Sequence, residues 1–553
     1  MAQDTTSFLR LLAQAEDATD QERWPDAAHY WCQVVEINPV DGRFWLNLAD
    51  ARIHDGDIRG AIEPLEQVLA LRQEFPPETM VRLAGCHAHL GDESAALDWL
   101  ERAIAGGHRD LAGLERNDDF AALRPVPRFQ DLVGLIDDSR DMSRDDAWRF
   151  DLRFAAREIK RRAYAPFGEV PEPEFDAVVA RIDHAIPGLT DHQVIIELMK
   201  LVRRLNDGHA RVRPPEDRED MQRAVPLQFF LFEEGLFVTA AAPEHEALLG
   251  AEILAIGGHD LDTVIAAFEP VIARDNENRQ WFRAGLPPFL REPSVLHALG
   301  LIPEPDRIPY TVRTMSGEIE TITIEADASW PAWKIRDAFP YPEGWRFLPE
   351  TLPGEAPHYL RNADLPFWFQ ALSETRTLYF QFNQVRDAAS ETLAGVGERI
   401  LAAIEAGHAE KLVIDMRWNG GGNTFKEMPL LRQIIASRRV NRRGALFVII
   451  GRNTFSAAQN GVNFLSHHSR AIFVGEPTGS SPIFIGETNH FELPHSKTVM
   501  NISDLRWVGT WPDDYRIWLP PTLYAPPTFA LYRQNRDPAM EAIQGYGEHL
   551  PGQ

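Results

Sequence analysis

Apolar residues in the first part of the chain recur at helical spacing, and residues 24–106 repeat themselves with a shift of 34 or 35 positions. In each unit a small residue is followed four positions later by a large one, so both lie on one face of a predicted helix. The pairs are Ala27 with Trp31, Ala61 with Leu65, and Ala96 with Leu100. This pattern predicts an all-α array of helix pairs over 1–140, in which 110–140 is an atypical capping unit.

The hydrophobic pattern changes twice in the middle of the chain. Over 141–215 the apolar positions remain helical, and the last predicted helix ends at the turn-forming run 206–209. Short strand-like runs follow over 216–330, which predicts a small β module. The clearest of these runs are 227–232, 236–239 and 252–256. Segment 331–366 is rich in Pro, Trp and Gly, and we expect it to form a long ordered connection.

Strands and helices alternate in the last third of the chain, over 367–545. The predicted strands are 378–382, 412–416, 446–450 and 472–474, and the helices between them are 391–408, 425–437 and 456–466. Such alternation predicts right-handed βαβ units on a mainly parallel sheet. Reactive groups in such folds lie at the carboxyl ends of the strands, so candidate catalytic residues are expected there.

Composition narrows the class of protein. The 553 residues carry 82 acidic and 56 basic side chains, a net charge of −26, so neither nucleic acid nor a membrane surface is expected as a partner. The chain has no apolar run long enough for a transmembrane helix, and its N-terminus does not resemble a signal peptide. Cys32 and Cys86 are expected to be small buried hydrophobes, and neither metal nor cofactor is expected. A cytoplasmic, multidomain protein is predicted.

Two strand ends carry candidate chemistry. The run 415–423, DMRWNGGGN, places three glycines after a buried strand, where backbone N–H groups can face a ligand. Phosphate binding is the rival interpretation, but the Gly-Lys-Ser/Thr of a phosphate loop does not follow. The run 449–460 places Ser456 at a strand-to-helix turn, where its Oγ would be exposed beside helix N-terminal N–H groups. The other interpretation of Ser456, an N-cap residue, is preferred for the serine alone, whereas the neighbouring glycine turn favours a nucleophile.

Three ordered motifs resemble a known family over about 145–545. They are DMRWNGGG at 415–422, NTFSAA at 453–458 and VGEPTG at 474–479. These motifs resemble the C-terminal processing peptidase and tricorn core protease family of serine peptidases. The repeats over 24–106 resemble tetratricopeptide repeats, and 250–258 resembles the core strand and turn of a PDZ-like module.

The resemblance implies a multidomain fold with a tetratricopeptide-like array, a PDZ-like β module and an α/β core of the crotonase-like, ββα-spiral type. The implied domains are the repeats at 1–140, the helical start of the peptidase region at 141–215, the PDZ-like module at 216–330, the connecting segment at 331–366 and the catalytic core at 367–545. Ser456 is implied to be the nucleophile. The backbone N–H groups of Gly421 and Ala457 are implied to form the oxyanion hole.

The resemblance also implies two ways of activating the serine. Processing peptidases use a lysine about 25 residues past it, where this chain has Ser481. The chain has six lysines, and of these only Lys497 follows Ser456. Tricorn-like members use a histidine just past a helix, which matches His209, and a neutral imidazole can accept the serine proton. The other interpretation of His209 is a helix-capping or solvated histidine.

Two further positions follow from the tricorn-like pattern. The residue before the histidine is implied to hydrogen-bond, but it is Gly208 here, which leaves the histidine less well oriented. An acid late in the chain is implied as well, and we assign it to Asp514.

The leading hypothesis from the sequence is a serine peptidase that cleaves peptides or unfolded protein ends through an acyl-enzyme. The helical repeats would bind a protein partner, and an oligomer is compatible with the sequence. The alternative is a catalytically weak or inactive scaffold that recruits a partner through its repeats and PDZ-like module. A hydrolase of small esters or amides is the third interpretation.

Overall fold

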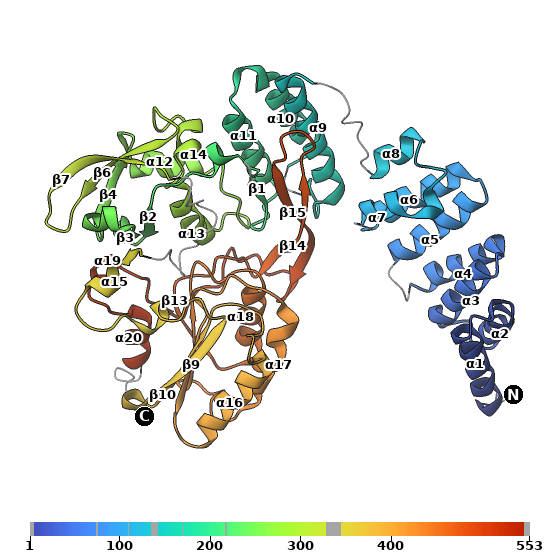
Figure 1. Cartoon of the computed structure of the whole chain (residues 1–553). Helices are drawn as coiled ribbons and strands as arrows, with labels where there is room; N and C mark the ends of the chain where they lie inside the picture. Colours follow the sequence, from blue (N-terminus) through green and yellow to red (C-terminus); the bar gives the residue numbers. More distant parts are fainter. Residues whose placement is uncertain are drawn as a thin grey trace. The chain divides into compact units, whose positions relative to one another are not determined.

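A computed structural model of the chain divides into two compact units, Met1–Asp141 (unit 1) and Met142–Gln553 (unit 2), drawn in Figure 1. The residues that the structure describes are 5–72, 76–108, 110–133, 142–168, 170–215, 218–327 and 344–546. Of the predicted connection 331–366, residues 331–343 lie outside the described residues.

Unit 1 consists of helices that pack in successive pairs, α1 with α2, α3 with α4 and α5 with α6. These helices are α1 (Thr5–Asp20), α2 (Trp24–Ile37), α3 (Gly42–His54), α4 (Ile58–Leu71), α5 (Pro76–His89), α6 (Glu93–Ala105), α7 (Leu111–Arg116) and α8 (Pro127–Val133). All six small and large residues of the repeated pairs are buried, as the pattern requires. Aspartate side chains cap α4 and α6 at Asp57 and Asp92, one residue after a left-handed glycine. The predicted helical array is confirmed.

Unit 2 begins with helices and continues into a seven-stranded sheet of order β2-β3-β4-β6-β7, with β5 beside β4 and β8 beside β3. The helices are α9 (Arg144–Arg162), α10 (Glu172–Ala185) and α11 (Asp191–Arg203). The strands are β2 (Leu227–Leu231), β3 (Leu236–Ala241), β4 (Glu252–Ile256), β5 (His259–Asp260), β6 (Arg307–Arg313), β7 (Ile319–Glu325) and β8 (Arg346–Phe347). Helices that accompany this sheet are α12 (Leu261–Phe268), α13 (Arg279–Phe289), α14 (Pro293–Ala298) and α15 (Leu348–Thr351).

The last third of the chain forms a six-stranded sheet of order β16-β13-β12-β11-β10-β9. Its strands are β9 (Phe367–Leu372), β10 (Thr377–Phe382), β11 (Lys411–Asp415), β12 (Leu446–Ile450), β13 (Ile472–Gly475) and β16 (Leu523–Tyr524). Neighbours from β10 to β13 and on to β16 are parallel, whereas the edge strand β9 is antiparallel. Consecutive parallel strands are thus neighbours, so their carboxyl ends lie along one edge.

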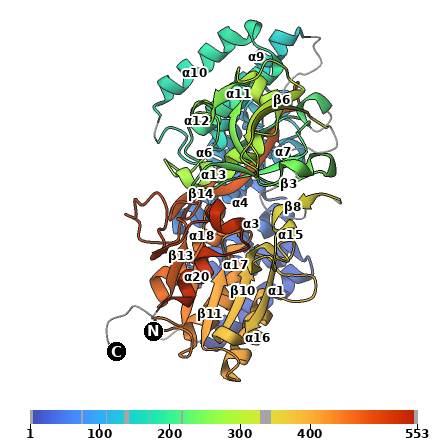
Figure 2. The same ribbon diagram turned by 90° about the vertical axis from the view of Figure 1, so that its left-hand side faces the viewer.

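Helices cover both faces of the six-stranded sheet, as Figure 1 and Figure 2 show. One face packs on α16 (Leu393–Glu405), α17 (Thr424–Ala436) and α18 (Ala457–His468). The other face packs on α20 (Pro538–Gln544), which follows the short helix α19 (Phe529–Tyr532). The two sets of core residues alternate along the strands, for example Ile414 on the first face and Val413 on the second. Because both faces are covered, the strands read as continuous apolar runs in the sequence.

A hairpin brings the start of unit 2 to the six-stranded sheet. The strand β1 (Arg211–Arg213) follows His209 and pairs with β15 (Val499–Val508), which pairs in turn with β14 (Ile483–Glu492). This three-stranded sheet therefore carries position 209 toward a segment almost 300 residues later in the chain. Among the described residues, we find no helix with the length and apolar character that crossing a membrane would require.

Candidate active site

Ser456 occupies the turn between β12 and α18, and its backbone conformation is strained. Its φ and ψ are 57° and −127°, outside the regions that a residue with a side chain normally adopts. It stands at the N-cap position of α18 but makes no capping hydrogen bond through its side chain. The structure therefore offers no support for Ser456 as a helix cap, and it shows a strained serine at a strand end.

The glycine turn after β11 lies directly against this serine. A Cβ added to Gly421 would be 2.7 Å from Ser456 Cβ and 2.9 Å from the backbone nitrogen of Ala457. Gly421 also has a φ of 101°, which favours glycine. The two strand ends selected from the sequence thus meet at one edge of the sheet, as the parallel topology requires.

The backbone N–H groups near Ser456 are not equally available. The N–H of Gly421 donates to Oδ1 of the buried Asn419 at 3.0 Å. The N–H of Gly421 is therefore engaged in this conformation, and its role as an oxyanion donor stays a prediction. The N–H of Ala457 makes no hydrogen bond to any residue that the structure describes, and it lies at the N-terminus of α18.

His209 packs against the residue that precedes the serine. Its ring centroid is 4.5 Å from that of Phe455 and 5.7 Å from that of Phe484. Neither ring nitrogen makes a hydrogen bond of normal geometry within the described parts of the chain, so no such bond joins His209 to Ser456. Burial, assisted by the positive charge of Arg211, lowers the pKa of His209 to about 3, which keeps the imidazole neutral at neutral pH.

The backbone of His209 is fixed by a buried acid that no motif in the sequence indicates. Asp207, 2% exposed, accepts the N–H of His209 at 2.8 Å and that of Ser503 in β15 at 3.0 Å. Its Oδ1 lies 3.8 Å from Nδ1 of His209. Burial raises the pKa of Asp207 to about 6. This acid anchors the end of α11 to the hairpin and so places the histidine.

Asp514 lies with other partners. Its carboxylate accepts hydrogen bonds from Arg516 at 2.6 and 2.9 Å and from the hydroxyl of Thr510 at 2.9 Å. The hydrogen bond to Arg516 is the main reason why the pKa of Asp514 is lowered to about 2. Thr510 also contacts Nε2 of His467 at 2.8 Å, and the described residues show no hydrogen bond between Asp514 and His209. The structure therefore places Asp514 with Arg516 and Thr510, and its assignment as the acid that orients His209 stays a prediction.

The positions considered for a lysine carry other chemistry. The hydroxyl of Ser481 donates to the backbone oxygen of Ile517 at 2.9 Å. Lys497 pairs with Glu492 at 3.4 Å, at the far end of the β14–β15 hairpin. The described residues also contain no cluster of three or more His, Cys, Asp or Glu that could hold a metal ion.

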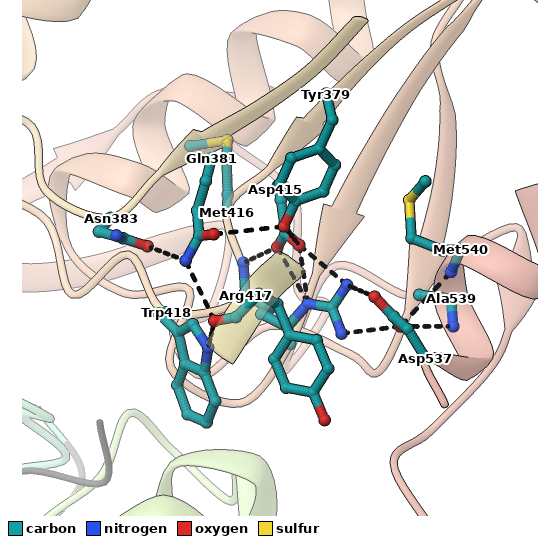
Figure 3. Close-up of polar contacts among 12 residues, drawn as sticks. Tyr379, Gln381, Asn383, Asp415, Met416, Arg417, Trp418, Asp537, Ala539 and Met540 are labelled. Carbon is teal, nitrogen blue, oxygen red and sulfur yellow. Dashed lines mark hydrogen bonds and ion pairs between the residues drawn. The ribbon is translucent and has the colours of Figure 1, made fainter. Parts of the chain in front are cut away.

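An ion-pair cluster fixes the start of the glycine turn, as Figure 3 shows. The guanidinium of Arg417 lies between the carboxylates of Asp415 and Asp537, with N–O distances of 2.8 to 3.0 Å. Tyr379 donates its hydroxyl proton to Asp415 at 2.7 Å. Asp415 and Arg417 belong to the glycine-rich motif, whereas Asp537 caps α20 and had no signal in the sequence. The cluster therefore ties the last helix to the turn that contacts Ser456.

Gly208, which departs from the family pattern, is enclosed in the structure. An added Cβ would lie 2.5 Å from Oδ1 of Asp275 and 3.1 Å from the ring of Phe455. We therefore expect Gly208→Ser to destabilise unit 2 by about 1 to 3 kcal/mol instead of improving the orientation of His209. Urea unfolding of the full chain measures this change. Gly188→Ser is the matched control, since a Cβ there meets no atom within 4 Å, and equal unfolding midpoints for both variants would contradict the expectation.

A comparison with family models identifies the helices of unit 1. A tetratricopeptide repeat family model matches residues 12–79 and 55–110. Unit 1 therefore contains tetratricopeptide repeats, as its 34-residue periodicity predicted. The comparison with curated proteins found no match.

Several solved structures are similar to this chain. Mature CPAF has 13% sequence identity and a TM-score of 0.48, with 72% of this chain and 96% of that chain covered. The photosystem II D1 C-terminal processing protease has 12% identity and a TM-score of 0.34, with 73% and 97% covered. The Yersinia enterocolitica type III secretion translocator chaperone SycD has 18% identity and a TM-score of 0.18, with 24% and 92% covered. These values are too low to transfer an activity or a residue role to this chain.

Proposed function

We propose that unit 2 is a serine peptidase that hydrolyses peptide bonds through an acyl-enzyme, with Ser456 as the nucleophile. The observation that carries the proposal is the strained backbone of Ser456 at a strand-to-helix turn, packed against the glycine turn of the neighbouring strand. Strain at a residue that caps nothing is typical of functional sites, where the surrounding fold holds a side chain in a reactive position.

The proposed mechanism is tricorn-like. Neutral His209 takes the proton of Ser456 Oγ, which attacks the peptide carbonyl, and the imidazolium then protonates the leaving amine. The N–H of Ala457 and the positive end of α18 stabilise the oxyanion, together with an N–H of the glycine turn. Gly421 can contribute only if its N–H leaves Asn419 when substrate binds. Water, activated in turn by His209, hydrolyses the acyl-enzyme.

The same resemblance suggests the kind of substrate and of partner. We infer that 216–330 is a PDZ-like module and 367–545 a crotonase-like core, and that the repeats of unit 1 bind a protein partner. Peptides or unfolded protein ends are the proposed substrates, because the resemblance of the three motifs to processing peptidases points to that class.

A fluorophosphonate that modifies activated serines tests the proposal. We expect one adduct on the full-length wild type, located by mass spectrometry at Ser456, and none on Ser456→Ala. Ser469→Ala is the matched control from the other end of α18, where the hydroxyl donates to the backbone oxygen of Leu465 and accepts the N–H of Ala471, and it should label like wild type. An unlabelled wild type, or a labelled Ser456→Ala variant, would contradict the proposal.

The second candidate function is an inactive scaffold. It is favoured by the absence of a hydrogen bond from the His209 ring to Ser456 and by the engaged N–H of Gly421. Ligand-free active sites often show long catalytic hydrogen bonds that shorten only with substrate, so these observations do not exclude catalysis. The scaffold predicts an unlabelled wild type with no peptide hydrolysis.

A further inference from the structure

A fully buried carboxylate lies between the loops that carry the two proposed catalytic residues. Asp275, 1% exposed, precedes α13 and accepts the N–H of Gly208 at 2.8 Å through Oδ1. Its Oδ2 accepts the N–H of Ser481 at 3.2 Å. One side chain thus joins three segments that are far apart in sequence, the turn before His209, the segment before α13 and the loop after β13.

The same carboxylate reaches the nucleophile through one intervening hydroxyl. The side chain of Ser480 interacts with the carboxylate of Asp275, and its Oγ accepts the backbone N–H of Ser456 at 3.1 Å. Since Ser480 Oγ accepts from Ser456, its own proton is free to point at the carboxylate. Ser480 therefore connects Asp275 to the strained backbone of Ser456.

A second contact from the same segment reinforces this link. The indole of Trp281, in the first turn of α13, donates its N–H to the backbone oxygen of Gly208 at 3.1 Å. Its ring stacks on Phe455 with centroids 3.8 Å apart and an interplanar angle of 9°. The segment 275–281 therefore hydrogen-bonds to both the N–H and the C=O of Gly208, and it also packs against Phe455, the residue before the nucleophile.

We propose that Asp275 is a positioning residue that sets the backbone of His209 and of Ser456 relative to each other. This inference rests on the proposed function. Its physical basis is that the serine follows a strand of the six-stranded sheet, whereas the histidine precedes a strand of the three-stranded sheet. A displacement of about 1 Å between reacting groups can lower the rate about 100-fold.

The cost of this carboxylate favours a functional reason for its presence. Asp275 is held by neutral backbone and hydroxyl donors, and burial raises its pKa to about 7. A buried acid of this kind is expensive compared with an apolar side chain, and Asp275 differs from the equally buried Asp151 in the segments that it joins. The three segments that it joins determine the relative positions of His209 and Ser456, which the reaction requires to be fixed.

Asp275→Asn tests the inference, because it keeps the shape of the side chain but removes one acceptor. We expect fluorophosphonate labelling and kcat for a peptide substrate to fall roughly 10- to 100-fold, with KM little changed. Asp151→Asn is the matched control. Asp151 is also fully buried and accepts two backbone N–H groups, those of His495 and Ser496, at the turn of the β14–β15 hairpin. This variant should keep the labelling rate within about twofold of wild type.

Hydrogen exchange measured by mass spectrometry separates this inference from the proposed function. Asp275→Asn should speed exchange in peptides covering both 203–212 and 453–460, and Asp151→Asn only around 493–498. Ser480→Ala should affect 453–460 and leave 203–212 unchanged. If wild type is not labelled, the proposed function fails, and the exchange pattern still decides whether Asp275 joins the two turns. Wild-type labelling of Asp275→Asn, or unchanged exchange at either turn, overturns the inference.

Discussion

Replacing Ser456 by glycine is expected to raise the free energy of unfolding of unit 2 by about 1 kcal/mol while it abolishes peptide hydrolysis. The φ of 57° with ψ of −127° costs a residue with a side chain about 1 to 3 kcal/mol, and glycine removes most of that strain. Against this gain stands about 0.5 to 1 kcal/mol for the extra freedom of glycine in the unfolded chain. Loss of the nucleophile should lower kcat at least about 1,000-fold.

The helix-cap interpretation of Ser456 predicts the opposite sign. Replacing a capping serine by glycine costs about 0.2 to 0.5 kcal/mol, so a cap would make the variant slightly less stable. Thr392 provides the matched control, because its hydroxyl accepts the N–H of Gly395 at 3.1 Å and caps α16. Thr392→Gly should be less stable than wild type, whereas Ser456→Gly should be more stable. Urea unfolding measures the stability of both variants, and peptide turnover measures kcat. A Ser456→Gly variant less stable than wild type would support the helix-cap interpretation.

Gly421→Ala is expected to reduce labelling of Ser456 at least about 100-fold and to destabilise unit 2 by about 2 to 5 kcal/mol. The added Cβ would meet Ser456 Cβ at 2.7 Å and the backbone of Phe455 and Ala457 at 2.9 Å. Backbone atoms cannot move aside as a flexible side chain can, so the nucleophile turn must shift. The φ of 101° adds strain to the same substitution.

Gly407→Ala separates strain from collision. Gly407 has a φ of 81°, but a Cβ there meets no atom within 4 Å. We expect this control to lose about 1 to 2 kcal/mol of stability from strain alone and to label at the wild-type rate. Labelling rates with the fluorophosphonate and urea midpoints check both variants. Equal labelling of the two alanine variants would show that the close approach of the strand ends does not matter for the site.

The parts of the fold predicted best from the sequence are those with one dominant periodicity. The strand predicted at 446–450 is β12 (Leu446–Ile450), because a strand buried on both faces is a continuous apolar run. The helical repeats could be predicted equally well, because small and large residues recur on one helix face. The β14–β15 hairpin was not predicted. Only half of β14 alternates between buried and exposed positions, so its pattern is weak.

The candidate site was predictable only where a residue type carries the chemistry itself. Ser456 and the glycine turn have such types at strand ends, and the structure brings them together. Asp275 could not be selected, because its partners are backbone N–H groups 67 and 206 residues away, and any residue except proline has that group. Gly208 departs from the family pattern for a related reason. Asp275 occupies the space that a side chain at position 208 would need, and the sequence does not show that the two residues are close.

The position of α20 determines when the core can form during synthesis. A chain is made from its N-terminus, and domains fold as they emerge. Strands β10 to β13 can pack on α16, α17 and α18 while later residues are still being added. Their second face stays bare until α20 supplies Ala539, Met540 and Ile543, and Arg417 lacks one of its two carboxylates until Asp537 follows. On the ribosome this sheet is therefore half-covered and open to aggregation until the last helix emerges.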